Sequence, residues 1–434
     1  MDSIYVNNFR GFTNTVLPIR PVNFFVGENS TGKTSLLALL DLLSQTEFWF
    51  NLNFNTGSYE FGNYKDIVSA SSRNQEEFQI GLCRPDMKQP ERSVSYMLHF
   101  NQGKNGLPRL VRFSQLSAVY RATMRLSGRE IAVQLTTNVP SSADCNYPER
   151  CFSYLHEAES HNDSDYRKLA GDVKGFIRKT PILHFPFILD QLFKDSKLHK
   201  KFDSFPFPVL QAHFASMAPI RTKPKRTYDG YAKHYSPEGE HTPYVIRETL
   251  PHGRKTNSFR EALEVFGEYS GLFETVGVAQ FGRDLSAPFE LTVTLNSKAL
   301  RINSVGYGVS QALPVVVELL TQGKRSWIAI QQPEVHLHPK AQAALGDLLF
   351  HAAIDRSQVL FVETHSDYLL DRFRLAMRNS EHPDSFAQVV FFERSADGNQ
   401  IFPMLIDKSG EYPQDQPQGF RAFFLAEQKR ILGI

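Results

Sequence analysis

Several features are scarce or missing in this sequence of 434 residues. It contains only three cysteines, Cys83, Cys145 and Cys151, and their spacing fits neither a disulfide framework nor a set of metal ligands. The first residues show no basic stretch followed by an apolar one, which a signal peptide would need. The longest apolar runs are far shorter than the roughly 20 residues that cross a membrane. These absences predict a soluble, cytoplasmic protein with ordinary thiols.

Charge of one sign is also not in excess. The chain has 48 Lys and Arg against 46 Asp and Glu, a net charge of +2. A balanced chain gives no global reason to bind nucleic acid, so any such surface must be local. The sequence has no internal repeat and no sustained heptad pattern, which excludes a long coiled-coil arm.

The densest basic cluster lies near the middle of the chain and has tyrosines close by. Two interpretations stay open: the cluster contacts the phosphates and bases of a nucleic acid, or it is a solvated loop. The residues concerned are Arg221, Lys223, Lys225 and Arg226, with Tyr228, Tyr231 and Tyr235.

Hydrophobic patterns divide the chain into three parts. Residues 1–145 begin with short strand-like runs around an apolar helix and continue as alternating strands joined by polar turns, typical of an antiparallel sheet. Residues 146–280 mix helical segments with Pro- and Gly-rich loops and are interpreted as a mainly helical insertion or lid. Residues 281–434 alternate apolar strands with helices, which favours a parallel sheet covered on both faces. The predicted fold class is α/β, with a core assembled from both ends of the chain.

The strongest motif reads GENSTGKT and matches G-x-x-x-x-G-K-[ST] in full. Its glycines let backbone N–H groups curl around phosphate oxygens, while Lys33 offers a positive charge and Thr34 a hydroxyl for Mg²⁺. A strand-like run precedes the motif and an apolar helix follows, so the helix dipole also favours phosphate. The motif predicts that ATP and Mg²⁺ bind to Asn29, Ser30, Thr31, Gly32, Lys33, Thr34 and Ser35.

Four further segments occur in a recognisable order. They read NFRGF at 8–12, VGYGVSQ at 305–311, IAIQQPEVHLHP at 328–339 and VETHS at 362–366. Together with the GENSTGKT loop, this order resembles the SMC/RecF/OLD-like branch of ABC ATPases. The stretches APIRTKPKRTY and PEGEHTPYV resemble stand-alone bacterial members, several of which serve phage defence, such as the ATPases of Septu and PARIS systems. The resemblance implies an ABC-type P-loop core and a homodimer or higher homo-oligomer that closes head-to-tail around two ATPs.

The resemblance also assigns a signature motif. The usual Ser-x-Gly is degenerate here and reads Gly306-Tyr307-Gly308. Gly308 would present backbone N–H groups to the γ-phosphate held by another subunit. The missing hydroxyl would come from Ser304 or from Ser310.

Three more positions carry roles implied by the resemblance. His365 matches the switch histidine that contacts the γ-phosphate from the end of a buried strand. Arg10 stands where the family has a basic residue near the nucleotide, and Asp66 falls near the loop that couples the nucleotide to the insertion. Both Arg10 and Asp66 also fit exposed charges in turns.

The Walker B segment departs from the family pattern. The positions of the Mg²⁺-shell acid and the catalytic glutamate read Gln331 and Gln332, which can orient water but cannot accept a proton at neutral pH. The nearest carboxylate is Glu334. Either Glu334 is the base, or hydrolysis is slow and ATP acts mainly as a clamp. His336 and His338 fit the turn after this strand rather than a metal pair, because no further ligands stand at helical spacing.

These features predict an ATP-binding, slowly hydrolysing, dimerising ATPase. As a nucleotide-gated switch it would control a separate effector, a nuclease or toxin, in bacterial anti-phage defence. The alternative is a RecF/SMC-like repair ATPase that binds DNA directly. An OLD-type nuclease would need a C-terminal TOPRIM domain, and too few residues follow His365 to form one. A transporter ATPase fits the long insertion poorly.

Overall fold

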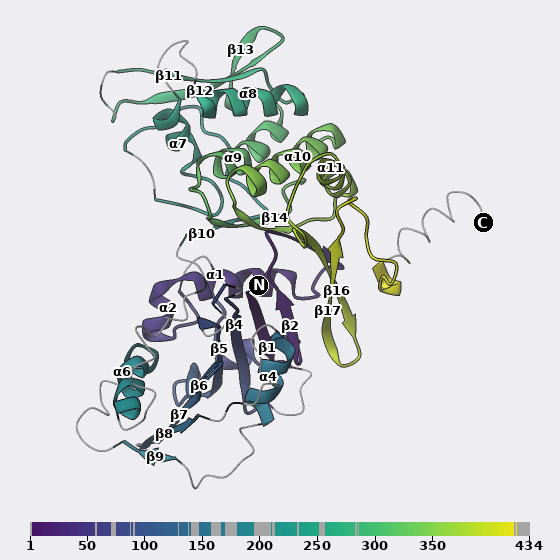
Figure 1. Ribbon diagram of the computed structural model, residues 1–434. Helices are drawn as coiled ribbons and strands as arrows, with labels where there is room; N and C mark the ends of the chain where they lie inside the picture. Colours follow the sequence, from purple (N-terminus) through teal and green to yellow (C-terminus); the bar gives the residue numbers. More distant parts are fainter. Residues whose placement is uncertain are drawn as a thin grey trace. The chain divides into compact units, whose positions relative to one another are not determined.

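A computed structural model describes residues 2–422 apart from 57–58, 71–74, 87, 90–91, 129, 138, 140–146, 158–165, 170–179, 195–209, 211–212, 232–233, 251–256, 283, 285 and 421. Contacts divide the chain into two compact units. Unit 1 comprises Met1–Arg20, Glu28–Ala212 and Phe392–Pro403. Unit 2 comprises Pro21–Gly27, His213–Phe391 and Met404–Ile434. Figure 1 traces the chain through both units.

The core of unit 2 contains the first four strands of a six-stranded sheet with the order β10-β14-β15-β3-β16-β17, and β16 and β17 each contribute residues to both units. In that order its strands are Phe214–Met217, Trp327–Gln331, Val359–Glu363, Val22–Gly27, Ala387–Ser395 and Gly398–Ile406. The first four are parallel neighbours, and the central three are almost wholly buried. Their continuous apolar sequences are typical of strands covered on both faces. Because they are parallel, their C-terminal ends lie on one border of the sheet, here called the carboxyl edge.

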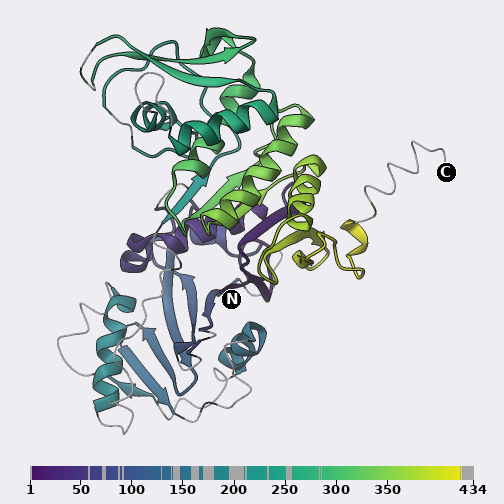
Figure 2. The same cartoon turned by 45° about the horizontal axis from the view of Figure 1, so that its top comes forward.

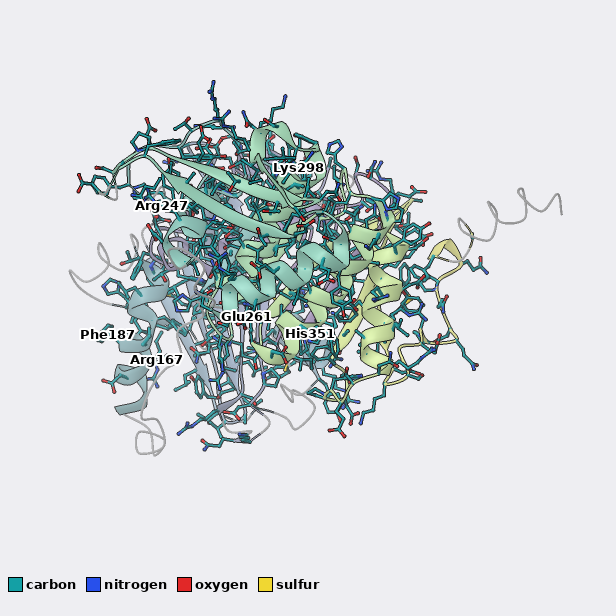
Figure 3. The ribbon with its side chains drawn as sticks, turned by 90° about the horizontal axis from the view of Figure 1, so that it is seen from above. Arg167, Phe187, Arg247, Glu261, Lys298 and His351 are labelled. Carbon is teal, nitrogen blue, oxygen red and sulfur yellow. The ribbon has the colours of Figure 1, made fainter. Side chains whose placement is uncertain are left out.

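Helices α7 to α11 and a small antiparallel sheet, β11-β12-β13, complete unit 2 (Figures 1 and 2). Helices α10 and α11 pack closely at Gly346, where a Cβ atom would lie 2.4 Å from the carbonyl oxygen of Leu369. Arg247, labelled in Figure 3, comes from α7 and has its guanidinium carbon 4.5 Å from the centre of the Phe289 ring on β12. The bounds are Thr242–Thr249 (α7), Ser258–Ser270 (α8), Tyr307–Thr321 (α9), Pro339–Asp355 (α10), Asp367–Arg378 (α11), Thr275–Gln280 (β11), Phe289–Leu295 (β12) and Lys298–Arg301 (β13).

Unit 1 is built on an eight-stranded sheet in the order β2-β1-β4-β5-β6-β7-β8-β9, with antiparallel neighbours throughout. Helix α4 packs on one face of it, with Phe152 stacked on Tyr5 at 4.8 Å between ring centres. The strands are Ser3–Asn7 (β1), Thr15–Pro18 (β2), Phe78–Arg84 (β4), Val94–Gln102 (β5), Pro108–Ser117 (β6), Arg121–Ser127 (β7), Glu130–Thr136 (β8) and Arg167–Lys168 (β9). The helices are Lys33–Ser44 (α1), Thr46–Asn51 (α2), Tyr64–Ile67 (α3), Pro148–Glu157 (α4) and Pro181–Lys194 (α6).

The α/β class, the antiparallel sheet of the N-terminal part and the parallel core drawn from both chain ends are confirmed. The structure divides the chain into two units, whose boundaries differ from the predicted ones at 145 and 280. The predicted insertion, 146–280, is shared between the units, because β10 pairs with β14 in the core sheet while α4 packs on the sheet of unit 1. Cys83 and Cys151 are buried free thiols, and Cys145 lies outside the described residues. Across the described helices, none is both long and apolar enough to span a bilayer.

Candidate functional site

The loop that follows β3 has a backbone suited to phosphate. Ser30 and Gly32 adopt left-handed conformations, with φ of 62° and 95°. Gly32 has no room for a side chain, because a Cβ atom there would lie 2.4 Å from the ring of Phe12. Helix α1 begins at the next residue, and the N-terminus of a helix favours an anion through its N–H groups and its dipole.

Lys33 lies inside this loop rather than in solvent. Its side chain is 3% exposed, and Nζ donates a hydrogen bond to the carbonyl oxygen of Glu28 at 2.6 Å. The hydroxyl of Thr31 donates to the same oxygen at 2.8 Å. Asn29, Ser30 and Thr34 are exposed. The loop therefore holds its lysine in place, and a phosphate would give that buried ammonium group a charged acceptor.

A pocket of about 470 Å³ in unit 1 adjoins Ser30. Arg10 lines it, donating to the carbonyl oxygens of Phe61 at 2.9 Å and of Asp66 at 3.2 Å, and burial lowers the pKa of Arg10 against the opposing charge of Asp66. Arg394 also lines the pocket and donates to the carbonyl oxygen of Ser30 at 2.5 Å. Arg10, Asp66 and Ser30 thus line one pocket, and the roles of Arg10 and Asp66 towards the nucleotide stay predictions. Sequence reasoning missed Arg394, since no motif marks a residue so distant along the chain.

The carboxyl edge of the core sheet carries Glu334. Its Oε1 accepts a hydrogen bond from the backbone N–H of His365 at 2.7 Å. Its Oε2 is buried and has no hydrogen-bond partner among the described residues. A buried carboxylate oxygen in that state is costly, so the position fits a water molecule or a metal-bound water that donates to it.

The two glutamines lie next to Glu334 but differ in their surroundings. Gln331 ends β14 and is 5% exposed. Gln332 has a left-handed backbone with φ of 43°, and its N–H donates to the carbonyl oxygen of Glu363 at 2.8 Å. This bond ties the turn after β14 to the end of β15, which positions Glu334 against His365.

Arg221 is buried behind the same edge. Its side chain is 1% exposed and donates to the carbonyl oxygens of Gln331 at 2.9 Å and Gln311 at 3.3 Å. Burial lowers the pKa of Arg221 to about 10, although the charge of Glu334 acts in the opposite direction. The prediction that Arg221 contacts nucleic acid is therefore wrong, because the residues after β10 carry it into the interior.

The other residues of the basic cluster and its tyrosines differ in their exposure. Tyr228 is 7% exposed and its hydroxyl accepts from the N–H of Lys225 at 3.0 Å, so it cannot stack on a base as predicted. Lys223, Lys225 and Arg226 are exposed, and their contact with nucleic acid stays a prediction.

The predicted signature motif lies at the start of α9. Gly306 precedes the helix and Gly308 is in its first turn, where a Cβ atom would lie 3.3 Å from the carbonyl oxygen of His336. The hydroxyl of Ser310 donates to the carbonyl oxygen of Tyr307 at 2.7 Å, whereas Ser304 is exposed. Of the two serines, Ser304 is thus the one on the surface.

The three histidines of this region have different surroundings. The side chain of His365 is exposed at the carboxyl edge. The ring of His336 meets Tyr307 edge-on, with 4.9 Å between ring centres. His338 caps α10, where Nδ1 accepts from the N–H of Lys340 at 3.3 Å.

The predicted site residues thus form one group in each unit. Arg10 and residues 29–35 belong to unit 1, while Gly308, Gln331, Gln332, Glu334 and His365 belong to unit 2. Gly27 ends β3 at the carboxyl edge of unit 2, and the chain runs from it directly into the loop.

Comparisons with known proteins give two family matches. Residues 153–371, just over half of the chain, match a family described as AAA domain, putative AbiEii toxin, Type IV TA system. Residues 1–166 match a family described as AAA ATPase domain. No curated protein matches the sequence.

Solved structures of SMC head domains share the arrangement of elements only distantly. The SMC head domain from Thermotoga maritima is 10% identical with a TM-score of 0.40, over 92% of this chain and 97% of that one. An Smc head domain bound to the C-winged helix domain of ScpA is 12% identical with a TM-score of 0.44, over 94% and 98%. One from Pyrococcus yayanosii, with a coiled coil and joint, is 9% identical with a TM-score of 0.43, over 99% and 100%. At these values the likeness supports no functional argument.

Proposed function

The chain belongs to the AAA-domain family that matches residues 153–371, and from this premise we propose that it binds ATP with Mg²⁺ and hydrolyses it slowly. The observation that carries the proposal is the loop from Gly27 to Thr34, with its left-handed backbone and its buried Lys33. Lys33 binds the β- and γ-phosphates, Thr34 contributes its hydroxyl to the Mg²⁺ shell, and Arg10 contacts the nucleotide.

Hydrolysis in this proposal depends on Glu334. Bound Mg²⁺ neutralises charge on the phosphates, which is the chemistry that the ion supplies. Oε2 of Glu334 accepts the proton of the attacking water, while the N–H of His365 keeps the carboxylate in place through Oε1. Gln332 orients the water, Gln331 contributes to the Mg²⁺ shell, and the ring of His365 contacts the γ-phosphate. Two glutamines where two carboxylates are usual support a low rate.

The nucleotide serves as a switch. Two copies close head-to-tail on two ATPs, with the start of α9 near Gly308 facing the γ-phosphate bound by the other copy. Closure then acts on a separate effector, a nuclease or toxin, in anti-phage defence. The description of the matching family, which names a toxin–antitoxin system, supports a role of this kind.

A second candidate function is DNA repair through direct DNA binding. Lys223, Lys225 and Arg226 are exposed, and none forms an ion pair with another described residue. Such cations favour phosphate contacts. Their number is small, and the net charge of +2 gives no further support. We therefore rank this function second.

The decisive experiment measures molar mass by light scattering without nucleotide, with ADP and with ATP plus Mg²⁺. We expect a dimer only with ATP plus Mg²⁺, and a monomer without nucleotide and with ADP. Gly306→Asp is the informative variant, because a Cβ atom at Gly306 meets nothing within 4 Å and a side chain fits there without strain. Its negative charge should repel the γ-phosphate of the partner copy, so the variant binds ATP but stays monomeric. Gly306→Ala is the matched control and should dimerise. A fully active monomer at high concentration would refute the switch.

A further inference from the structure

Arg221 has no part in the chemistry proposed above, yet it is one of the largest fully buried side chains of the protein. It follows β10, the edge strand of the parallel core, and points away from solvent. Burying a guanidinium group is expensive unless hydrogen bonds and an opposite charge compensate for it. The groups that accept hydrogen bonds from Arg221 therefore show which elements it holds together.

The hydrogen bonds of Arg221 join two elements that the proposed reaction uses. One donor reaches the carbonyl oxygen of Gln331 at the end of β14, and another reaches that of Gln311 on α9. The side-chain amide of Gln311 in turn donates to the carbonyl oxygen of Arg221 at 3.5 Å. A single cation thus links the helix that starts with Gly306-Tyr307-Gly308 to the strand that leads into Glu334.

The opposite charge comes from Glu334. This carboxylate is the charged group whose attraction acts on Arg221, and the two side chains form no direct ion pair. Arg221 Nε and Glu334 Oε2 are both buried without a hydrogen-bond partner among the described residues.

We propose that Arg221 is a positioning residue for hydrolysis, holding in place the end of β14 that leads to Glu334 and coupling it to α9. The inference rests on the proposed function. When the start of α9 is displaced, as closure on a partner copy would require, the bond to Gln311 transmits the movement to Arg221. Arg221 then passes it to the end of β14 and so to Glu334. Binding of the partner copy's nucleotide at the signature motif would in this way determine the position of Glu334.

The test compares Arg221→Met, Arg221→Lys and the control Lys298→Met, which changes an exposed lysine on β13 of the same unit. ATP affinity is measured by calorimetry, kcat and KM by phosphate release, and folding by thermal unfolding. Because Arg221→Met removes the charge but not the loop that binds phosphate, we expect kcat to fall by about 10²-fold, the lower range for loss of general-base assistance, with the Kd for ATP within about twofold. Arg221→Lys keeps the charge and should recover part of kcat, and Lys298→Met should match the wild type.

A double-mutant cycle with Glu334→Gln separates positioning from a merely structural role. If Arg221 acts through Glu334, adding Arg221→Met to Glu334→Gln lowers kcat no further. Additive losses, or an equal loss of ATP affinity in Arg221→Met, would overturn the inference. If Arg221→Met does not fold, the same cycle is run with Arg221→Lys, with the same two criteria. A wild type without any ATPase activity refutes the proposed function itself, whereas an active wild type with an unaffected Arg221→Met refutes only this inference.

Discussion

In the loop of unit 1 that we propose binds phosphate, the buried charge is Lys33, and the loop's own carbonyl oxygen at Glu28 accepts its hydrogen bond. At the carboxyl edge of unit 2 the charge is Glu334, and one of its two oxygens is buried without a partner among the described residues. The buried charge of the loop thus has a hydrogen-bond partner within the loop, while the carboxyl edge has one acceptor oxygen without such a partner among the described residues. From this difference we expect the loop to be preformed for the proposed binding and the edge to gain its last hydrogen bond from what binds there.

Replacing Lys33 should have the largest effect and tests the first half of this contrast. Lys33→Ala removes the charge-assisted hydrogen bonds to phosphate, so we expect the Kd for ATP to rise by about 10²-fold or more, with the fold intact. Calorimetry measures the affinity and circular dichroism the fold. Lys104→Ala, which changes an exposed lysine of unit 1, is the control and should bind normally. Unchanged binding by Lys33→Ala would refute the assignment of the loop.

Replacing Glu334 tests the second half. If its spare oxygen takes the proton of the attacking water, Glu334→Gln should lower the ATPase rate by about 10²–10⁴-fold and leave ATP affinity unchanged. If ATP acts only as a clamp, the substitution should barely change an already low rate. Phosphate release under single-turnover conditions distinguishes the two. A brisk rate that survives Glu334→Gln contradicts both and makes His365 the next residue to test.

A histidine–glutamate pair of unit 1 should give the smallest effect. His99 of β5 is fully buried and its Nδ1 lies 2.6 Å from Oε1 of Glu77. Burial raises the pKa of Glu77, but the hydrogen bond and charge of His99 outweigh it and lower the pKa to about 2. A lowered pKa stabilises the fold above the ordinary value of 4.5, and the contribution is lost as pH falls from there towards 2.

Glu77→Gln should therefore lower the midpoint of thermal unfolding at pH 7 by roughly 2–4 °C. The difference from the wild type should shrink as the pH falls below 4.5. Differential scanning calorimetry between pH 7 and pH 3.5 measures it, and ATP affinity at pH 7 should not change. A difference that stays constant with pH would show that the pair stabilises unit 1 by packing alone.

The sequence predicts the geometry of the loop but not that of the carboxyl edge, and the reason is physical. The loop's backbone, its lysine and the start of its helix lie within eight consecutive residues, so a local pattern predicts them. The position of Glu334 depends on the pairing of β14 with β15, which brings the N–H of His365 to its carboxylate. Such contacts between distant segments leave no local pattern.

Arg221 shows the same limit more sharply. It is part of a run of basic residues, which is typical of a solvated or nucleic-acid-binding surface. The strand before it, Phe214–Met217, is only four residues long and becomes recognisable through its pairing with β14. That pairing carries Arg221 inwards while Lys223 and Lys225 stay exposed.

The anchor of Glu334 is a main-chain N–H rather than a side chain. Every amino acid except proline supplies that donor, so the geometry of the carboxylate does not depend on which side chain stands at position 365. The imidazole of His365 and the placement of Glu334 are therefore separate traits. In the proposed reaction, a substitution at position 365 would alter the contact with the γ-phosphate while leaving Glu334 where it is.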